Sequence, residues 1–369
     1  MQECFWLTNY LETLLVQVWH PMTVATNSRE QKKVIAAELK ATGSGLEGLA
    51  FKLHDFGYRG VSSVESAATG GAGHLVNFMG TDTMAGYVCA RQYYDEPMAG
   101  FSIPAAEHST ITSWGKDGEV DAFRNMLTQY PEGLVAVVSD SFDIIKACTD
   151  LWGGELIETV KNRKGTLVVR PDSGDPATIV VQVLEALGSK FEPTKTETGH
   201  KLLPPYLRVI QGDGVSLESL KEILGNMTKN GWAADNLAFG SGGALLQKLN
   251  RDTQKCAFKC SSITVNGEER EVFKDPITDP GKKSKKGRLS LQKLAYPASQ
   301  EEMDAAGIYG KHDASLVGTE RIMTICEGKG DPAKDMLVEV FRDGELKVDH
   351  KFSEVRQRAD LPGGPFGGA

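Results

Sequence analysis

Residue types that can do chemistry recur where short apolar runs of this sequence end. The run TLVV leads into Arg170-Pro171-Asp172, and the run YLRVIQ leads into Gly212-Asp213-Gly214. An arginine fork suits the oxygens of a phosphate or pyrophosphate, and a nearby carboxylate can bind ribose hydroxyls or a magnesium-bound water. The alternatives are a self-satisfied Arg–Asp ion pair for the first motif and an Asx-turn or helix N-cap for the second.

Two more motifs have the same placement. Gly240-Ser241-Gly242-Gly243 follows an apolar run and precedes ALLQKL, so backbone N–H groups could approach a phosphate at a helix start; an ordinary tight turn is the alternative. His108 follows PAAE, where a histidine could act as acid, base or nucleophile near neutral pH, or could be structural.

An aromatic pair and a basic run complete the candidate residues. Phe56 and Tyr58 lie just before Arg59, and an aromatic ring beside an arginine can stack on a flat ligand ring while the arginine holds a phosphate. Phe56 could instead belong to the core. The run KKSKKGR (282–288) is a solvated loop, a nucleic-acid patch or a loop over an anionic ligand. Together the motifs predict a site for a phosphorylated sugar with a second phosphate and a flat aromatic partner.

Short strands that alternate with amphipathic helices would position these residues. The apolar runs lie at 75–82, 101–109, 134–141, 166–174, 206–214 and 236–243, and an earlier unit starts near residue 51. Strands alternating with helices predict a parallel sheet. We therefore expect an irregular (α/β) barrel, with an open doubly wound sheet as the main alternative. In both folds ligands bind beyond the carboxyl ends of the strands, which here carry Asp82, His108, Asp140, Arg170, Asp172, Asp213 and the Gly240–Gly243 run.

Composition limits the function classes. The formal charge of −8 over 369 residues argues against general nucleic-acid binding. No apolar run approaches the roughly 18 residues of a membrane span, and six cysteines are too sparse for a disulfide framework. We expect a cytoplasmic protein with neither nucleic acid nor membrane as a partner. After about residue 250 the strand–helix rhythm stops, and we expect a mobile segment at 297–316 and a hairpin turn at Asp343-Gly344.

Long motifs in a fixed order carry a family resemblance. KLHDFGYRGVSS, HLVNFMGTDT, PAAEHSTIT, RPDSGDP and AFGSGGALLQKL resemble the nicotinamide phosphoribosyltransferases, which are type II phosphoribosyltransferases. The resemblance runs from about residue 3 to residue 292. It implies an irregular (α/β) barrel with a second β-rich domain, incomplete here because the sequence begins inside the family's N-terminal part. The implied division is 1–20 as a remnant of the N-terminal domain, 21–250 as the barrel, and 251–369 as a basic loop and C-terminal α+β segment.

The resemblance implies a pentosyltransferase of NAD salvage. It would transfer the phosphoribosyl group of 5-phosphoribosyl 1-pyrophosphate to nicotinamide, giving nicotinamide mononucleotide and pyrophosphate. Mg²⁺ with the pyrophosphate and ATP as a facultative co-substrate are implied, and so is a homodimer with shared active sites. The alternatives are a nicotinate phosphoribosyltransferase, or a truncated, catalytically inactive binding or regulatory homologue.

The same resemblance implies roles for single residues. The implied catalytic residues are His108, the phosphorylated group in ATP hydrolysis, with Arg170 and Asp172. Phe56 would stack on the nicotinamide ring, and Asp82 would accept from the carboxamide and repel the like charge of nicotinate. The other implied substrate-binding residues are Arg59 at the pyrophosphate, Gly212 and Asp213 at the ribose, Gly242 and Gly243 at the 5′-phosphate with Arg251 and Lys259 from the partner subunit, and Lys274 and Lys282 at the pyrophosphate or ATP phosphates. No protein metal ligand is implied.

Overall fold

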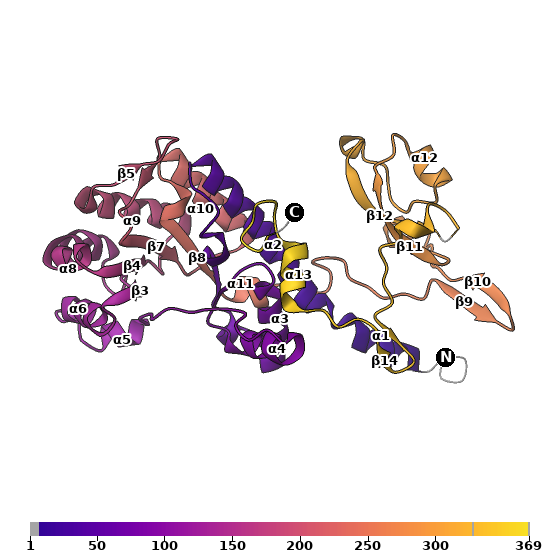
Figure 1. Ribbon diagram of the computed structural model, residues 1–369, viewed down its shortest axis with the longest axis horizontal. Coiled ribbons are helices and arrows are strands. Elements are labelled where there is room, and N and C mark those ends of the chain that lie inside the picture. Colours follow the sequence, from indigo (N-terminus) through magenta and orange to yellow (C-terminus); the bar gives the residue numbers. More distant parts are fainter. Residues whose placement is uncertain (1–6, 327, 368–369) are drawn as a thin grey trace. The chain divides into compact units, whose positions relative to one another are not determined.

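The computed structural model describes residues 7–326 and 328–367, which form two compact units. The barrel unit contains residues 17–256 and 350–369, and the second unit contains residues 257–349 together with helix α1 (Thr8–Val16) (Figure 1). The predicted division kept 251–369 together, whereas the structure places residues 350–367 with the barrel. Within the described residues, no helix has the length and apolar character needed to cross a membrane.

A parallel sheet forms the centre of the barrel unit. In spatial order its strands are β2 (Gly80–Thr81), β1 (Leu53–Asp55), β8 (Leu237–Ser241), β7 (Leu207–Gln211), β4 (Lys164–Arg170) and β3 (Glu132–Val138). Each neighbouring pair is parallel. The prediction of a parallel α/β sheet is confirmed.

The segment 101–106 joins the two edges of this sheet. Phe101 forms a parallel bridge with Gly80 of β2, and Ala105 forms one with Ala136 of β3. The N–H of Ala106 donates to the Ala136 carbonyl at 2.9 Å. The sheet is therefore closed, as the predicted irregular barrel requires, and the open doubly wound alternative is wrong. The predicted strand at 101–109 is reduced to these two bridges.

Alternating side chains divide the barrel interior from its outer core, as the pleat of a strand dictates. Ala136, Val168 and Ile210 are buried side chains of three adjacent strands, and they pack together with Phe56 and Ile103. Their sequence neighbours on the strands belong to the main core beneath the helices, including Val135, Val137, Leu167, Val169, Val209 and Phe239. The apolar runs are thus buried on both faces, which explains why they read as continuous hydrophobic strands.

Helices surround the barrel (Figure 1). They are α2 (Trp19–Ala41), α3 (Val64–Leu75), α4 (Met84–Tyr94), α5 (His108–Thr112), α6 (Glu119–Gln129), α7 (Ile144–Lys146), α8 (Ile157–Lys161), α9 (Pro176–Phe191), α10 (Leu217–Lys229), α11 (Gly243–Leu246) and α13 (Phe352–Ala359), with a π-helix at Ala147–Glu155 and a small hairpin of β5 (Thr194–Lys195) and β6 (Lys201–Leu202). Side-chain caps begin several of them: Asp175 accepts from the N–H of Thr178 at α9, where Pro176 holds the first helical position.

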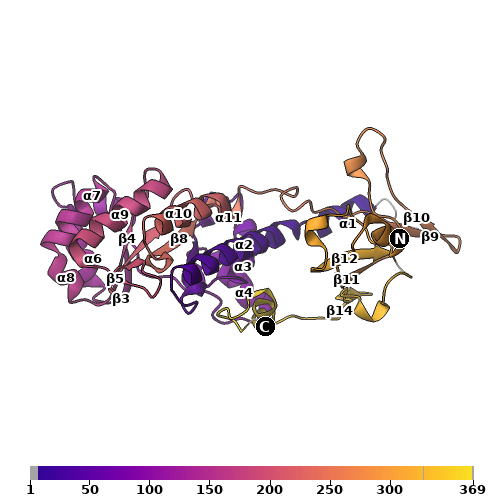
Figure 2. The same ribbon diagram turned by 90° about the horizontal axis from the view of Figure 1, so that it is seen from above.

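The glycines Gly70, Gly71 and Gly73 lie inside α3. Their role is packing, because a Cβ built on Gly86 of α4 would lie 2.8 Å from the Cα of Gly71. The two helices approach too closely for side chains at this crossing. Helix α2 packs on α3 and α10 as well (Figure 2).

Residues 350–367 are anchored to the barrel unit. The Nζ of Lys32 on α2 bonds to Oδ1 of Asp360 at 2.5 Å, and both side chains are 0% exposed. Arg356 of α13 donates to the carbonyl oxygens of Leu75 and Ala99. The ring of Phe366 lies 4.5 Å from the Lys32 ammonium.

The second unit is built from antiparallel pairs. Its elements besides α1 are β9 (Ser262–Val265) with β10 (Glu268–Glu271), β11 (Leu289–Ala295) with β12 (Glu320–Cys326), β13 (Phe341–Arg342) with β14 (Glu345–Leu346), and α12 (Gln300–Ala305). The predicted turn at Asp343-Gly344 is confirmed, with positive φ at both residues. The segment 297–316, expected to be mobile, forms α12 and contributes Met303 and Ile308 to a small core.

Candidate functional site

The carboxyl ends of the barrel strands bring most of the predicted residues to one end of the barrel. Phe56 follows β1, Asp82 follows β2, Asp140 follows β3, Arg170 ends β4 with Asp172 just beyond, Gly212 and Asp213 follow β7, and Gly242 and Gly243 follow β8. His108 begins α5, directly after the segment that closes the barrel. This convergence follows from parallel strands, whose carboxyl ends share one edge.

Arg170 lies at the centre of this group. Its side chain donates to Oδ1 of Asp172 from Nη2 at 2.9 Å and from Nε at 3.1 Å. The ion pair left open as an alternative is therefore present. The guanidinium carbon also lies 5.5 Å from the centre of the Phe56 ring. Gly212 makes room for this arrangement, because a Cβ there would lie 2.7 Å from Nε of Arg170.

A backbone hydrogen bond holds Phe56 against β8, and the absence of a side chain at Gly240 leaves room for the Phe56 ring. The N–H of Phe56 donates to the Ser241 carbonyl at 2.9 Å. A Cβ built on Gly240 would lie 2.0 Å from Cε2 of the ring, so only glycine accepts the ring here. The side chain is half-buried, which leaves part of the ring accessible to a ligand.

We expect Gly240→Ala to displace the Phe56 ring and to raise the KM of a ligand that stacks on this ring about ten-fold. Overpacking should also lower the free energy of unfolding by about 1–3 kcal/mol. Steady-state kinetics and urea unfolding measure the two effects. Gly225→Ala on α10 is the matched control, since a Cβ there meets no atom within 4 Å. Equal KM values for the two variants would contradict the proposed role of Gly240.

His108 is paired with Asp140, a residue that the sequence placed at a strand end without assigning it a role. Nε2 of His108 lies 2.9 Å from Oδ1 of Asp140, whose side chain is 2% exposed. Oδ2 of Asp140 accepts from the N–H of Asp172 at 2.9 Å. Burial raises the pKa of Asp140, but hydrogen bonds from Ser173, His108 and the Asp172 N–H outweigh it and leave the pKa below its ordinary value. Asp140 therefore stays ionised and orients the imidazole.

The core below fixes Asp140 in place. The preceding residue, Ser139, accepts from the indole N–H of Trp152 at 3.0 Å, and its own N–H donates to the Arg170 carbonyl at 3.0 Å. Trp152 stacks on Phe123 with ring centres 4.3 Å apart. Buried aromatic packing thus sets the register of the β3 end against β4. Only Asp140's position after an apolar run could have indicated its role from the sequence.

Asp82 and Arg59 are the more exposed members of the group. Asp82 accepts a short hydrogen bond from the Ser102 hydroxyl, and its N–H donates to the Asp55 carbonyl at 2.9 Å. Arg59 lies 4.0 Å from Glu107, and both side chains are largely exposed. Both residues are therefore free to reach a ligand beyond the strand ends.

A buried carboxyl, Asp55, supports the Phe56 turn. Its Oδ1 accepts from the N–H of Gly57 at 2.7 Å. Burial raises the pKa of Asp55 from 3.8 to about 6, although the Gly57 hydrogen bond opposes the shift. The carboxyl therefore titrates close to the physiological range.

This raised pKa predicts a pH dependence of stability. The unfolded chain releases the Asp55 proton near 3.8 and the folded chain only near 6, so this group's contribution to stability falls as pH rises through that window. Asp55→Asn should flatten the dependence and raise stability at pH 7 by about 1–3 kcal/mol. Urea unfolding from pH 4.5 to 7.5 measures it, with Asp117→Asn on the exposed surface as control. Parallel curves for wild type and Asp55→Asn would contradict it.

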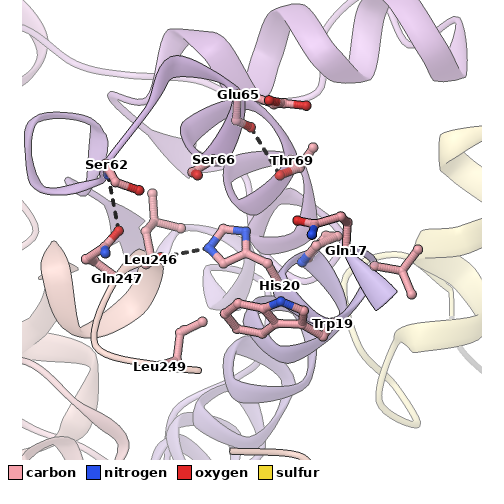
Figure 3. A pocket seen from close by; sticks show the side chains of 12 residues that line it. Gln17, Trp19, His20, Ser62, Glu65, Ser66, Thr69, Leu246, Gln247 and Leu249 are labelled. Carbon is pink, nitrogen blue, oxygen red and sulfur yellow. Dashed lines mark hydrogen bonds between the residues drawn. The ribbon is translucent and has the colours of Figure 1, made fainter. Parts of the chain in front are cut away.

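Hydrogen bonds from α2 and from the loop before α3 support the segment that follows the Gly242–Gly243 turn. Helix α11 has only four residues, which is shorter than the expected ALLQKL helix and leaves less dipole at the turn. His20 of α2 points at α11, and its Nε2 lies 2.8 Å from the Leu246 carbonyl (Figure 3). Oε1 of Gln247 accepts from the Ser62 N–H at 3.2 Å. A cavity of about 360 Å³ beside Trp19 and His20 adjoins these hydrogen bonds.

The remaining predicted residues lie elsewhere. Arg251 is exposed in the barrel unit and pairs with Asp252 at 3.5 Å. Lys259, Lys274 and Lys282 are exposed residues of the second unit, where Lys282 pairs with Asp279 at 3.2 Å.

Comparisons with known proteins agree with this geometry. Residues 51–345 match the nicotinate phosphoribosyltransferase (NAPRTase) family. The chain is 50% identical over 361 residues to a nicotinamide phosphoribosyltransferase of Xanthomonas campestris, covering 97% of this chain and 73% of that protein. It is 32% identical to one of Acinetobacter baylyi, covering 96% and 70%, and 33% identical to one of Mycoplasma pneumoniae, covering 79% and 65%.

Proposed function

Since the chain belongs to the nicotinate phosphoribosyltransferase family, we propose that it transfers the phosphoribosyl group of 5-phosphoribosyl 1-pyrophosphate to nicotinamide. The products are nicotinamide mononucleotide and pyrophosphate, which makes the chain an enzyme of NAD salvage. One observation carries the proposal: Arg170 lies between the Phe56 ring and Asp172 at the strand ends. The Arg170 cation, which can bind a phosphate, therefore contacts both an aromatic ring for stacking and a carboxylate.

The transfer requires alignment and charge stabilisation from the protein. The bond between C1 of the ribose and pyrophosphate breaks while the pyridine nitrogen bonds to C1, and positive charge develops on the sugar. Phe56 would hold the pyridine ring flat, and Asp172 and Asp213 would bind the ribose hydroxyls. Arg170 and Arg59 would neutralise the charge that grows on the departing pyrophosphate. No protein nucleophile toward the sugar is needed.

We propose that Mg²⁺ enters with pyrophosphate oxygens. Asp172 and Asp213 follow the neighbouring strands β4 and β7, and their carboxylate oxygens are the ligand type that Mg²⁺ prefers. Across residues 7–326 and 328–367, no three His, Cys, Asp or Glu side chains are placed to hold a metal by themselves. A shared site with substrate oxygens therefore fits these residues. When bound, the ion would offset negative charge on the pyrophosphate.

We propose that Nδ1 of His108 accepts the γ-phosphoryl group of ATP, with ADP as the leaving group. The Asp140 carboxylate holds Nε2 through a 2.9 Å hydrogen bond, so an imidazolium or a phosphorylated ring would stay oriented. Asp140 acts here as a positioning residue.

We also propose a cytoplasmic homodimer, in which Arg251 and Lys259 serve the partner's site. An exposed apolar groove between α3 and α4 supports a protein contact, because Val64, Met84, Val88 and Tyr93 are each more than half exposed. Apolar side chains that are exposed together in one groove, rather than singly over the surface, are typical of a protein contact.

Asp82 would set the preference for nicotinamide over nicotinate. A carboxylate accepts from the carboxamide and repels a second carboxylate, so Asp82→Ser should shift the ratio of kcat/KM values toward nicotinate by about ten-fold, or about 1.4 kcal/mol. Competition assays with both substrates measure the ratio. Asp121→Ser on exposed α6 is the control, and an unchanged ratio in Asp82→Ser would exclude this role.

The first test of the function is product formation by the purified 369-residue chain. Nicotinamide or nicotinate is supplied with 5-phosphoribosyl 1-pyrophosphate and Mg²⁺, with and without ATP, and products are identified by mass. We expect nicotinamide mononucleotide and a higher yield with ATP. Product from nicotinate alone would favour the nicotinate enzyme, and a folded chain without product would favour an inactive homologue.

A further inference from the structure

The basic run at 282–288 contains one lysine that differs from the other cations around it. Four cations of the run pair with carboxylates: Lys282 with Asp279 at 3.2 Å, Lys283 with Asp275 at 2.8 Å, Lys286 with Glu271 at 2.7 Å and Arg288 with Glu269 at 2.8 Å. Lys285 instead donates to the neutral hydroxyl of Thr324 at 2.6 Å, and it forms no ion pair within the described part of the chain. Partial burial lowers the pKa of Lys285, as expected for a cation without a nearby anion.

Lys285 lines a cavity of about 640 Å³ in the second unit, called the Lys285 pocket here. Its lining includes Lys283, Lys311, Asp304, Tyr309 and Ile308. Lys311 likewise forms no ion pair among residues 7–326 and 328–367. The lining therefore has three ammonium groups against one carboxylate, and two of the three lack a carboxylate partner.

Hydrogen bonds on several sides fix the walls of the Lys285 pocket. The Tyr309 hydroxyl donates to the Lys286 carbonyl at 2.8 Å and accepts from the Lys286 N–H at 3.2 Å, which fastens the basic run to the segment after α12. The Tyr309 N–H donates to the Thr324 carbonyl at 3.0 Å, and Ile308 bridges to Ile325 of β12. The small core with Met303 lies beneath. The two lysines are thus carried by rigid neighbours.

We propose that the Lys285 pocket binds a small phosphate-bearing anion. An anion between Lys285 and Lys311 would be the counter-ion of two exposed ammonium groups that form no ion pair in the described part of the chain, and lysine binds phosphate as a point charge. The implied substrate residues Lys274 and Lys282 do not line the pocket themselves, although Gly281 and Lys283 on either side of Lys282 do. The proposal gives a role to the segment 297–326 and does not depend on the reaction at the barrel.

Protection of lysines from acetylation tests the proposal directly on the full chain. N-hydroxysuccinimide acetate is applied with inorganic phosphate, pyrophosphate or sodium chloride at equal ionic strength, and modified peptides are quantified by mass spectrometry. Phosphate or pyrophosphate at ten times its dissociation constant should slow modification of Lys285 and Lys311 about ten-fold. Lys293, which pairs with Glu320 at 2.9 Å in the same unit, should keep its rate. Equal slowing at Lys293, or none at Lys285, would overturn the proposal.

Variants separate this pocket from the barrel site. Lys285→Gln should abolish the protection of Lys311, and the matched Lys293→Gln should preserve it. Arg170→Ala should also preserve it, so loss of the transferase reaction and loss of this pocket are distinguishable. Persistent protection of Lys311 in Lys285→Gln would show that the two lysines do not share a ligand.

Discussion

Replacing Arg170 with alanine is expected to lower kcat/KM for phosphoribosyl transfer by about 10²–10³-fold, as loss of one preorganised charge-stabilising group does. The side chain is 10% exposed, so its positive charge acts with little screening by water. It also contacts both the Phe56 ring and Asp172. Its removal should therefore affect the ring, the ribose and the pyrophosphate together.

Further variants identify the origin of the Arg170 effect. Arg170→Lys should recover only part of the rate, since an ammonium cannot keep both bonds to Asp172. Arg124→Ala on exposed α6 is the control and should leave the kinetics unchanged. Steady-state kinetics with circular dichroism measure activity and folding side by side. A folded Arg170→Ala within three-fold of wild type would remove Arg170 from the proposed mechanism.

The second large effect is expected at the buried Lys32–Asp360 pair. Asp360→Asn would leave the Lys32 ammonium buried without its counter-charge, which typically costs about 3–5 kcal/mol. Urea unfolding at pH 7 measures the loss. The double variant Lys32→Met/Asp360→Leu should be less destabilised than Asp360→Asn, because no unpaired charge remains.

The next residue on α2 provides a matched control for this pair. Lys33 bonds to Glu30 at 2.6 Å, with side chains 45% and 44% exposed, so Glu30→Gln should cost less than about 1 kcal/mol. Costs of similar size for Asp360→Asn and Glu30→Gln would mean that burial does not determine the strength of the Lys32–Asp360 pair.

The barrel and its strand ends were predictable because the buried parallel strands combine hydrophobic runs with polar residues at one end. The apolar runs at 134–141 and 166–174 overlap β3 and β4, and helices follow both strands. The closing segment was predicted as a regular strand. Pro104 lacks a backbone N–H, and only its carbonyl takes part in the bridge, so the segment forms contacts without a ladder.

The sequence predicted which residues belong to the site, but it did not predict which of them form hydrogen bonds or ion pairs with one another. Strand-end position singled out Arg170, Asp172 and His108, whereas the partnership of His108 with Asp140 depends on two loops 32 residues apart. Gly240 was interpreted as part of a phosphate turn, and the structure shows that it also accommodates the Phe56 ring. Close contacts between distant segments leave no local pattern that periodicity could detect.

The discontinuity of the barrel unit has a consequence for synthesis on the ribosome. Residues 17–256 leave the ribosome before residues 257–349, yet the core around Lys32 is completed only by residues 350–367, which are translated later still. During that interval the Lys32 ammonium has no Asp360 and the C-terminal end of α3 lacks Arg356. The core around Lys32 therefore stays incomplete until residues 350–367 have emerged and docked.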